Sequence, residues 1–513
     1  MVFSEWSLKR KFFICAVVPI LVFLLSLFLI CLVNTLNSSD VSKNHTLNEI
    51  CSFMKIDRND SEAVQRFSKS LTFPTVSFSD HSTVNTSAFL EYHSFLNRSY
   101  PGVFQSNLTT VEKVNNLSLL ITIQGSLPDS PPYFLISHLD VVPADASKWS
   151  NCDPFSGQIE DDWICGRGAI DAKVTHIAIL EALNGYLEQG YSPKFSIILV
   201  FGHDEETGGK YGAREVSNLL MERNIKPMFI LDEGTGVFER VFPGLDNPLA
   251  ALGVSEKGFL SLKMKAKALR GNSIIPPFDS AIGKLSKAIT NLALDSQRSW
   301  FGYGPETVLL KNIAPFVSFG YRFMLSNLWL FSPLVNRIIL NNEKLRTLVQ
   351  TTTYFVHIEG GFKGSAIPGE ASATVNHEVH PLDSFEDVLE MNRLAVADDS
   401  IEFKIMKRRA SSRETPYDEN GWAYHLLAAT ARQTFGLHVI DTPILLFGGT
   451  DSKHFARFTQ HIIRFTPAML DEASIASVHG FDEGMSVPNF LRAIKFYENL
   501  ISVVDCEAYS SKG

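Results

Sequence analysis

Four short apolar segments each end in carboxylates, a histidine or small polar residues, and this repeated pattern restricts the fold more than any other feature. Continuous apolar runs of this length are typical of strands that are buried on both faces of a parallel or mixed sheet. Ligands of open α/β sheets bind just beyond the carboxyl ends of such strands, so the polar groups are expected at one edge. The segments are 133–137, followed by His138 and Asp140; 196–201, followed by His203 to Glu206; 228–231, followed by Asp232 and Glu233; and 444–447, followed by Gly448 to Ser452.

Between the first two segments, the apolar spacing changes to that of a helix. Residues 175–189 place Ile177, Leu180, Leu183 and Leu187 on one helical face, and Gly190 follows as a typical helix end. Alternation of strands and helices is the signature of an α/β domain. We therefore predict a mixed-sheet α/β domain.

Acidic and histidine side chains gathered at one edge of a sheet need a cation. The HDEE sequence of residues 203–206 would be costly alone, because buried like charges repel and lose their hydration. A divalent ion held by the cluster removes this cost. Mixed nitrogen and oxygen donors favour zinc, whereas a purely oxygen site would have indicated magnesium or calcium.

An uncharged apolar segment, residues 12–33, precedes the globular part of the chain. Its 22 residues are enough to cross roughly 30 Å of hydrocarbon as a helix. Lys9, Arg10 and Lys11 come before it, so we expect a cytosolic N-terminus and a lumenal or extracellular remainder. The prediction is a single-pass type II membrane protein at the cell surface or in an endolysosomal or vacuolar compartment. The alternative is a cleaved signal peptide and a secreted protein.

Asn-x-Ser/Thr sequons support the lumenal assignment. All seven follow the apolar segment and none lies beyond residue 118, which predicts an exposed, glycosylated first part of the lumenal chain. The acceptors would be Asn37, Asn44, Asn59, Asn85, Asn97, Asn107 and Asn116.

Composition and cysteine content agree with this view. A length of 513 residues predicts two or more domains. A net charge of −9 argues against a general nucleic-acid binder, which needs a basic face.

Cys152 and Cys165 bracket a turn and short hairpin and are expected to form a disulfide, although free buried thiols are the competing interpretation.

Six motifs in order resemble the M20 family of di-zinc aminoacylases and carboxypeptidases. The resemblance covers about residues 60–505 and is strongest to the branch of carboxypeptidase S and the N-fatty-acyl-amino-acid synthase/hydrolases. The motifs are SHLDVVP (137–143), GRGAIDAK (166–173), GHDEETGG (202–209), LDEG (231–234), GGTDSKHF (448–455) and VHGFDE (478–483).

The resemblance implies roles for individual residues and two zinc ions per subunit. His138 and Glu206 would each bind one ion, Asp171 would bridge both, and His479 would complete the second site. Either Glu233 or Asp232 would complete the first site, because adjacent residues at a strand end point in opposite directions; Glu233 is preferred by motif position. Asp140 would orient His138 through its second ring nitrogen, and Glu205 would be the general base.

The resemblance also implies two domains and a small-molecule substrate. The expected organisation is a cytoplasmic tail (1–11), a membrane span (12–33), a stalk (34–60), two catalytic segments (61–254 and 382–513) and an inserted α+β lid (255–381). The lid would close over the substrate and form a homodimer interface. Residues 316–340 are rich in large apolar side chains and are expected to be packed lid helices, with acyl-chain contact as the alternative.

Three lid positions depart from the family pattern. Asn272 replaces the histidine expected to stabilise the oxyanion, and an amide donates a hydrogen bond but carries no charge. Glu378 replaces an arginine expected to bind the substrate carboxylate, and Ser365 replaces an asparagine. Asp451 and Ser452 are further candidate substrate contacts.

Two functions follow. The first is a membrane-anchored zinc amidohydrolase that cleaves, or reversibly forms, the amide bond of N-acyl amino acids or small peptides. The second is a weak or inactive descendant that binds acyl-amino-acid-like ligands. The presence of Glu205 and of every expected metal ligand favours the first, and the three lid changes favour the second.

Overall fold

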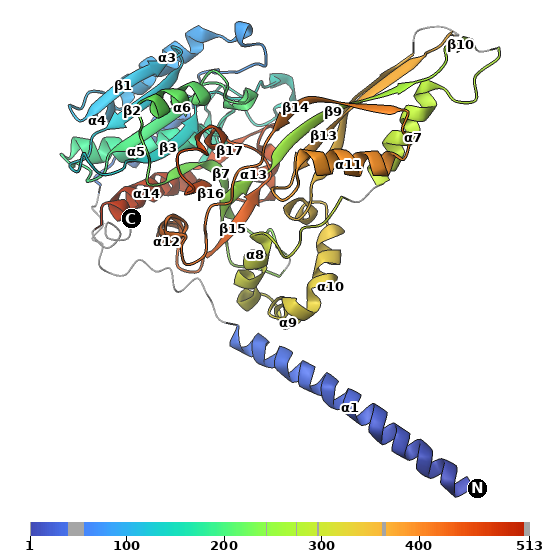
Figure 1. The fold of residues 1–513 in the computed structure, drawn as a ribbon. Coiled ribbons are helices and arrows are strands. Elements are labelled where there is room, and N and C mark those ends of the chain that lie inside the picture. The colour runs from blue at the N-terminus through green and yellow to red at the C-terminus, as the bar shows by residue number, and fades with distance from the viewer. Residues whose placement is uncertain are drawn as a thin grey trace.

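An eight-stranded mixed sheet with helices on both faces forms the body of the molecule (Figure 1). The computed structural model describes residues 2–38, 56–242, 244–272, 274–294, 297–361 and 366–506. In spatial order the strands are β1 (Thr109–Val114), β2 (Ser118–Ile123), β6 (Ile197–Gly202), β3 (Tyr133–His138), β7 (Ile230–Phe238), β16 (Ile462–Leu470), β8 (Leu249–Glu256) and β15 (Ile440–Leu446).

Successive residues of the central strands enter two different cores, as buried strands require. In β3, Leu135 packs with the helices of one face, and its neighbours Phe134 and Ile136 pack with those of the other. One face is covered by α2 (Asp60–Leu71), α5 (Lys173–Glu188), α12 (Trp422–Phe435) and α14 (Val487–Val504), and the other by α6 (Ala213–Glu222) and the 3-10 helix η7 (Asp451–Phe455).

The strand directions agree with the predicted edge for three of the four apolar segments. β3 is parallel to both β6 and β7, so the residues that follow β3 and β6 meet at one edge. β15 is parallel to β8, which is antiparallel to β7, so β15 runs in the opposite direction. The expectation that all four strands end at one edge is therefore wrong for β15, and Asp451 reaches the other segments through η7.

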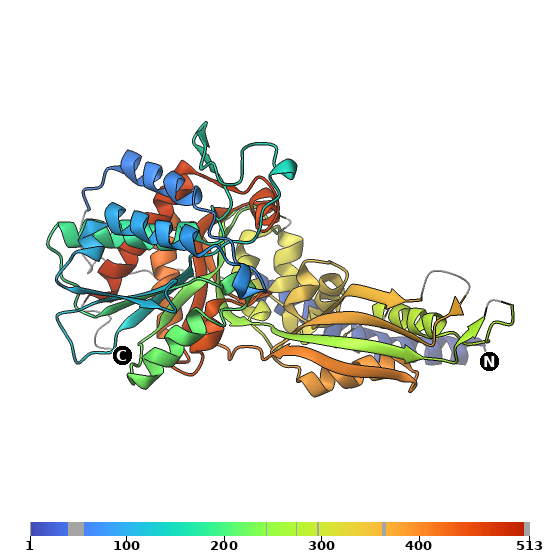
Figure 2. The same cartoon turned by 90° about the horizontal axis from the view of Figure 1, so that it is seen from above.

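A separate four-stranded antiparallel sheet projects from the body as an elongated arm (Figure 2). Its strands, in order, are β11 (Thr352–Gly360), β13 (Glu370–Val379), β9 (Gly258–Lys267) and β14 (Ile401–Arg409), and α7 (Ala281–Leu294) and α11 (Phe385–Val396) pack on it. The arm thus includes β14 and α11, which lie after the lid boundary predicted at residue 381. A single residue, Lys257, separates β8 of the body from β9 of the arm.

The apolar segment of residues 316–340 packs on the body and not on the arm. It forms α9 (Phe319–Leu325) and α10 (Leu328–Leu340), which follow α8 (Glu306–Ile313). Leu325, Leu328, Val335 and Ile339 join a core with residues of β8 and β15, such as Ala251. This edge of the large sheet is apolar and needs a cover, which explains why the segment lies there.

The N-terminal helix α1 (Val2–Asn37) stands apart from both sheets (Figure 1). Its residues Val18–Asn37 are long and apolar enough to cross a membrane, with a mean hydropathy of 2.5. Its C-terminal end contacts α9 and Asn327, the residue before α10.

A three-stranded sheet of β4 (Ile159–Glu160), β5 (Trp163–Cys165) and β17 (Gly484–Ser486) lies beside the body. The predicted disulfide joins Cys165 of β5 to Cys152 in the loop before β4, and the two Cα atoms are 6.4 Å apart. The remaining elements are α3 (Thr86–Ser99), α4 (Pro101–Phe104), α13 (Glu472–Ser477), β10 (Gly271–Asn272), β12 (Ala366–Ile367) and the 3-10 helices His81–Thr83, Ala146–Lys148, Glu205–Thr207, Ala314–Phe316 and Leu345–Leu348.

Candidate metal centre and adjoining groove

The carboxylate of Asp171 lies between two sets of potential metal ligands. Its Oδ1 is 3.0 Å from Nε2 of His138, and this nitrogen is also 3.2 Å from Oε1 of Glu233. Its Oδ2 is 3.0 Å from Nε2 of His479, which is also 3.0 Å from Oε2 of Glu206. The five side chains thus form two groups that share Asp171.

Of the two acids in the LDEG motif, only Glu233 faces His138. Asp232 points away and accepts hydrogen bonds from the backbone N–H groups of Glu233 (2.9 Å) and Ser452 (2.7 Å). Adjacent residues of a strand point to opposite sides, which separates the two roles. Asp232 therefore fixes the loop after β15 against β7.

Asp140 supports the cluster from behind. Nδ1 of His138 donates a 2.8 Å hydrogen bond to the backbone carbonyl of Asp140, and the carboxylate of Asp140 lies 3.4 Å from the same nitrogen. The carboxylate instead accepts hydrogen bonds from the backbone N–H groups of Glu205 (3.1 Å) and Glu206 (3.2 Å) and from the Ser77 hydroxyl (2.6 Å). Asp140 thus positions His138 mainly through its backbone and positions two neighbouring acids through its side chain.

The four residues of the HDEE sequence have two kinds of role: two hold the local structure together and two face the metal-ligand cluster. His203 is buried against Ser118, with Nδ1 2.7 Å from the hydroxyl. Asp204 accepts hydrogen bonds from the backbone N–H groups of Tyr211 (2.7 Å) and Gly212 (2.8 Å), which closes the loop before α6. Glu205 and Glu206 remain to face the cluster.

A buried ion pair that sequence reasoning missed holds Asp171 in place. Oε1 of Glu483 accepts hydrogen bonds from the backbone N–H groups of Ile170 (2.7 Å) and Asp171 (3.1 Å), and its Oε2 is 2.6 Å from the Arg167 guanidinium. Arg167 belongs to the GRGAIDAK motif and Glu483 to the VHGFDE motif. Their pairing across 316 residues of sequence could not be read from either motif alone.

Electrostatics within the cluster reflect crowding of acids and imidazoles. Burial opposes a charged His138, but Glu233, Asp140 and Asp171 outweigh burial and raise its pKa well above the ordinary value. Hydrogen bonds to Asp171 and Glu206 raise the pKa of His479 to about 10. Burial, followed by the charge of Asp171, raises the pKa of Glu206 to about 7. Positive charge is therefore strongly favoured between these carboxylates.

Glu205 has a lysine partner that the motif analysis did not assign. The ammonium group of Lys453 lies 3.1 Å from Oε1 of Glu205 and 4.0 Å from Oδ1 of Asp451. Asp451 is buried, and burial together with the neighbouring acids raises its pKa well above the ordinary value despite Lys453. Ser452 donates its backbone N–H to Asp232 of β7. Its hydroxyl contacts that of Thr450 at 2.6 Å and accepts a 3.0 Å hydrogen bond from Arg464 of β16, so Ser452 holds this loop against the sheet.

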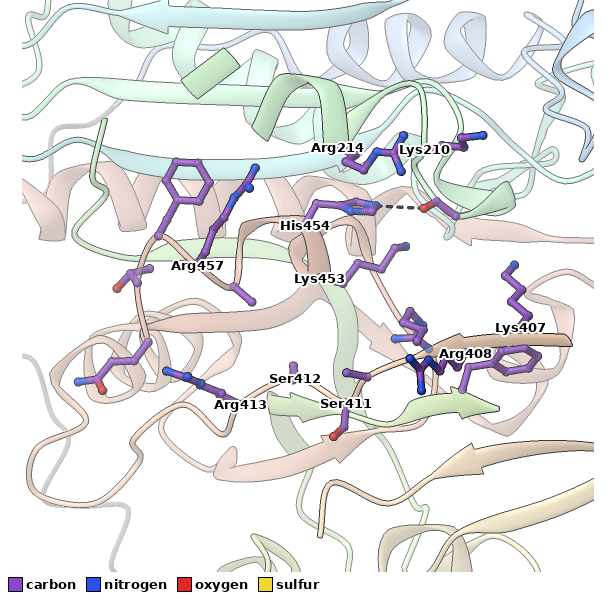
Figure 3. A pocket seen from close by; sticks show the side chains of 18 of the residues that line it. Lys210, Arg214, Lys407, Arg408, Ser411, Ser412, Arg413, Lys453, His454 and Arg457 are labelled. Carbon is purple, nitrogen blue, oxygen red and sulfur yellow. Dashed lines mark hydrogen bonds between the residues drawn. The ribbon is translucent and has the colours of Figure 1, made fainter. Parts of the chain in front are cut away.

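Lys453 also lines a broad basic groove between the body and the arm (Figure 3). The groove has a volume of about 1230 Å³, and none of its lining residues is acidic. Its cations come from the loop before α6 and the first turn of α6, from η7 and the residues after it, and from the end of β14 with the following loop. They are Lys210, Arg214, Lys407, Arg408, Arg409, Arg413, Lys453 and Arg457.

The lid residues singled out in the sequence do not join the metal cluster. Asn272 is exposed in β10, at the end of the arm farthest from the body (Figure 1), and its side chain accepts the backbone N–H groups of Ile274 and Ile275. Glu378 lies on β13, where its carboxylate accepts a 3.0 Å hydrogen bond from the Tyr354 hydroxyl. Burial raises the pKa of Glu378, against Tyr354, Arg409 and Lys257. Ser365 lies outside the described residues.

The sequon asparagines are solvent-exposed wherever the structure describes them. Asn59 and Asn85 are N-cap residues of α2 and α3, and Asn116 adopts a positive φ of 65° in the turn before β2. Asn44 lies outside the described residues. The exposed acceptors are Asn37, Asn59, Asn85, Asn97, Asn107 and Asn116.

The sequence profile of peptidase family M20/M25/M40 matches residues 134–503, which include the whole candidate centre. The chain belongs to the M20 peptidase family. It is a hydrolase of the M20 type.

Curated members of the M20 family resemble the chain over most of its length. It is 38% identical over 435 residues to the N-fatty-acyl-amino acid synthase/hydrolase PM20D1 of Mus musculus, covering 85% of this chain and 86% of the relative. It is 36% identical over 450 residues to the probable carboxypeptidase S-like 2 of Dictyostelium discoideum, covering 86% and 85%.

Solved M20 structures share the fold. The metallo-carboxypeptidase Sso-CP2 of Sulfolobus solfataricus superimposes with a TM-score of 0.63 at 18% identity, over 86% of this chain and 99% of that one. Human carnosine dipeptidase 1 gives a TM-score of 0.60 at 15% identity, over 87% and 96%. These similarities establish the mixed α/β fold, and the predicted family is confirmed.

Proposed function

We propose that this M20 hydrolase is a membrane-anchored, zinc-dependent amidohydrolase that cleaves, or reversibly forms, the amide bond of N-acyl amino acids or small peptides. The observation that carries the proposal is the arrangement around Asp171. Each of its two carboxylate oxygens contacts a different histidine, and each of these histidines contacts a further glutamate. Similarity to relatives named N-fatty-acyl-amino acid synthase/hydrolase and carboxypeptidase supports the choice of substrate class.

The donor set fits two zinc ions. Nitrogen and oxygen ligands about 2.0–2.2 Å from a tetrahedral zinc ion lie about 3.3 Å from each other. The nitrogen–oxygen separations of 3.0–3.2 Å within each group agree with that value. His138 and Glu233 would hold one ion, His479 and Glu206 the other, and Asp171 would contact both.

The residues around the centre supply a proton-transfer path. When bound, the zinc ions would lower the pKa of a water molecule and polarise the scissile carbonyl. Glu205 would accept the proton that the water loses as its oxygen attacks the amide carbon. Glu205 would then return this proton to the amine nitrogen as the carbon–nitrogen bond breaks. Lys453 holds the Glu205 carboxylate in place from the groove side.

The basic groove would bind the substrate carboxylate. Glu378 cannot replace the arginine expected at its position, because two carboxylates repel. The groove offers cations beside Glu205 through Lys453, so an anionic group could be bound next to the reacting amide. An N-acyl amino acid, whose carboxylate lies one carbon from the amide nitrogen, fits this arrangement.

The proposed location is the lumenal or extracellular side of a membrane. The apolar stretch Val18–Asn37 would be the anchor, and the exposed sequon asparagines would carry glycans. A homodimer through the arm is also proposed, since β11 is an edge strand with exposed Val356 and Ile358. In such a dimer, Asn272 at the far end of the arm would contribute to the centre of the second copy.

Hydrolysis assays on the full chain with added zinc test this function. A mass-spectrometric panel would contain N-fatty-acyl amino acids, N-acetyl amino acids and dipeptides, and Glu205→Gln would be compared with Glu112→Gln, a surface acid paired with Arg223. We expect release of amino acid that falls at least about 10²-fold in Glu205→Gln and is unchanged in Glu112→Gln. Equal rates in all three proteins would contradict the assignment. No turnover, with zinc retained, would favour the ligand-binding descendant.

A further inference from the structure

The helices α9 and α10 carry an exposed apolar face next to the C-terminal end of α1 (Figure 1). In α10 this face repeats at helical spacing, through Trp329, Leu330, Pro333, Leu334 and Ile338. Trp329 is 58% exposed and Leu334 is 47% exposed. Phe319 (60%) and Tyr321 (47%) of α9 extend it. A set of large apolar side chains this exposed indicates an interaction surface.

The opposite face of the two helices is packed on the body. Leu328, Val335 and Ile339 are buried in the core that includes residues of β8 and β15. The two helices are bent by 110° relative to each other. A hydrophobic pair that is half packed on a folded sheet lies along a surface and does not cross a bilayer, since a spanning segment would be apolar on every side.

Polar contacts fix this helical pair to the last turns of α1. Asn327, between α9 and α10, is buried and donates a 2.9 Å hydrogen bond to the backbone carbonyl of Cys31, while its own carbonyl accepts from Asn34 (2.9 Å). Arg322 is the only charged residue between residues 314 and 336. Its guanidinium donates to the backbone carbonyls of Thr35 (3.0 Å) and Ser38 (2.9 Å). The cation of α9 is therefore bound to α1. The exposed face of α10 carries one cation, Arg337, in its last turn, where a long side chain can reach the lipid headgroups.

These contacts set the depth of the pair along α1. The rings of Phe28 and Phe323 lie 5.9 Å apart. At a rise of 1.5 Å per residue, Phe28 is about 13 Å along the axis from Asn37, where α1 ends. α9 thus lies level with the last turns of the candidate span, at the depth where the headgroups and outer hydrocarbon of a bilayer would begin.

We infer that α9 and α10 form a second membrane contact, with Phe319, Tyr321, Trp329, Leu330, Leu334 and Ile338 inserted into the lumenal or outer leaflet beside α1. This inference rests on the proposed role of α1 as an anchor. The side-chain chemistry matches the interface, where tryptophan and tyrosine are enriched and an amphipathic helix lies in the membrane plane. The exposed face is the lipid-facing side of a hydrolase held flat on the bilayer.

The insertion of Trp329 can be measured in the full chain reconstituted into phosphatidylcholine vesicles. Brominated phosphatidylcholine quenches tryptophans that contact its acyl chains, so the emission difference between the wild-type protein and Trp329→Phe isolates the contribution of this residue. We expect brominated lipid to remove most of that contribution. Trp163→Phe is the matched control, because Trp163 is 38% exposed on β5, in the small sheet beside the body, and brominated lipid should leave its contribution unchanged.

Two outcomes would overturn the inference. One is a Trp329 contribution that brominated lipid leaves unchanged, as for Trp163; the other is quenching of Trp329 that Leu334→Glu does not reduce. Unquenched Trp329 together with dimers cross-linked through α10 would assign the face to a second copy of the chain. Alkaline carbonate extraction separately tests α1, because loss of the chain from the membrane would reject the anchor. The hydrolysis panel is independent of both results.

Discussion

The ammonium group of Lys453 lies 3.1 Å from the carboxylate of Glu205, and the same lysine lines the basic groove. One side chain therefore contacts both the proposed general base and the proposed carboxylate site. The surrounding acids raise the pKa of Lys453 against the effect of burial, so the lysine is charged at neutral pH. Its position couples the placement of Glu205 to the charge of the bound substrate.

Lys453→Met should lower kcat by about 10–100-fold, because a charge-assisted hydrogen bond worth about 1.5–3 kcal/mol is lost beside the base. Steady-state kinetics would separate kcat from KM. Lys453→Arg keeps the charge and should retain more activity than Lys453→Met. Equal activity of wild type and Lys453→Met would show that the contact is irrelevant to turnover.

His479→Ala should reduce bound zinc from two ions toward one per chain, because the second group then keeps only carboxylate donors. Elemental analysis after dialysis measures this directly. His357→Ala removes an exposed imidazole on β11 and should leave the zinc content unchanged. An unaltered zinc content in His479→Ala would remove this residue from the ligand set.

Arg413→Glu should raise KM for an N-acyl amino acid and leave kcat nearly unchanged, because Arg413 lines the groove but is not one of the residues of the candidate centre. Cation loss should matter less for the matching N-acyl amino acid amide, which lacks the carboxylate. Glu378→Gln should act in the opposite direction and lower KM, since an acid near Arg409 is neutralised. Identical effects on the acid and the amide would place the carboxylate elsewhere.

Arg167→Met should destabilise the protein by about 3–5 kcal/mol, because Glu483 would be left as an unpaired buried charge behind Asp171. Thermal unfolding of the zinc-loaded protein measures the change. Lys344→Met breaks an exposed pair with Glu472 and should leave Tm unchanged. Comparable Tm values for the two variants would contradict the buried role of Arg167.

Acid should destabilise the arm through His377, which is buried between Thr353 and Asn392. Burial lowers its pKa to about 4, below the 6.5 of an exposed histidine. The unfolded state therefore binds more protons between these values, so the free energy of unfolding falls as pH decreases from 6.5 to 4, by up to about 3 kcal/mol. His377→Gln should flatten this slope in chemical denaturation at several pH values, whereas His357→Gln should not.

Local sequence patterns predicted the individual strands that supply the centre more reliably than they predicted how these strands and their side chains are arranged relative to one another. The buried strands β3 and β6 were predicted to within one residue at each end, because continuous apolar runs have few alternatives. The prediction for β7 was wrong at its end, since the strand continues to Phe238 and contains Asp232 and Glu233 instead of ending before them. Strand alternation alone could not choose between Asp232 and Glu233, since it says only that the two point apart, and the preference for Glu233 came from motif position. The geometry gives Glu233 the contact with His138, and it gives Asp232 the hydrogen bonds from the backbone N–H groups of Glu233 and Ser452.

Long-range pairings were beyond sequence reasoning. The direction of β15 depends on pairing with β8, which its own residues do not encode. The packing of residues 316–340 on the body depends on an uncovered sheet edge contributed by residues 249–251 and 440–444. The basic groove gathers cations from three segments that are separate in the sequence. Each of these features arises from the meeting of distant segments, and none leaves a local signature.

The single-residue connection at Lys257 has a consequence for how this enzyme can change over evolution. Every residue of the candidate centre belongs to the body, whereas the wall of the groove formed by Lys407, Arg408 and Arg409 belongs to the arm. Substitutions in the arm can therefore alter which anion is accepted while the bond-breaking residues keep their mutual distances. The residues that select the substrate and the residues that break the bond thus lie on different structural units. Substrate preference can therefore change during evolution while the catalytic residues stay the same.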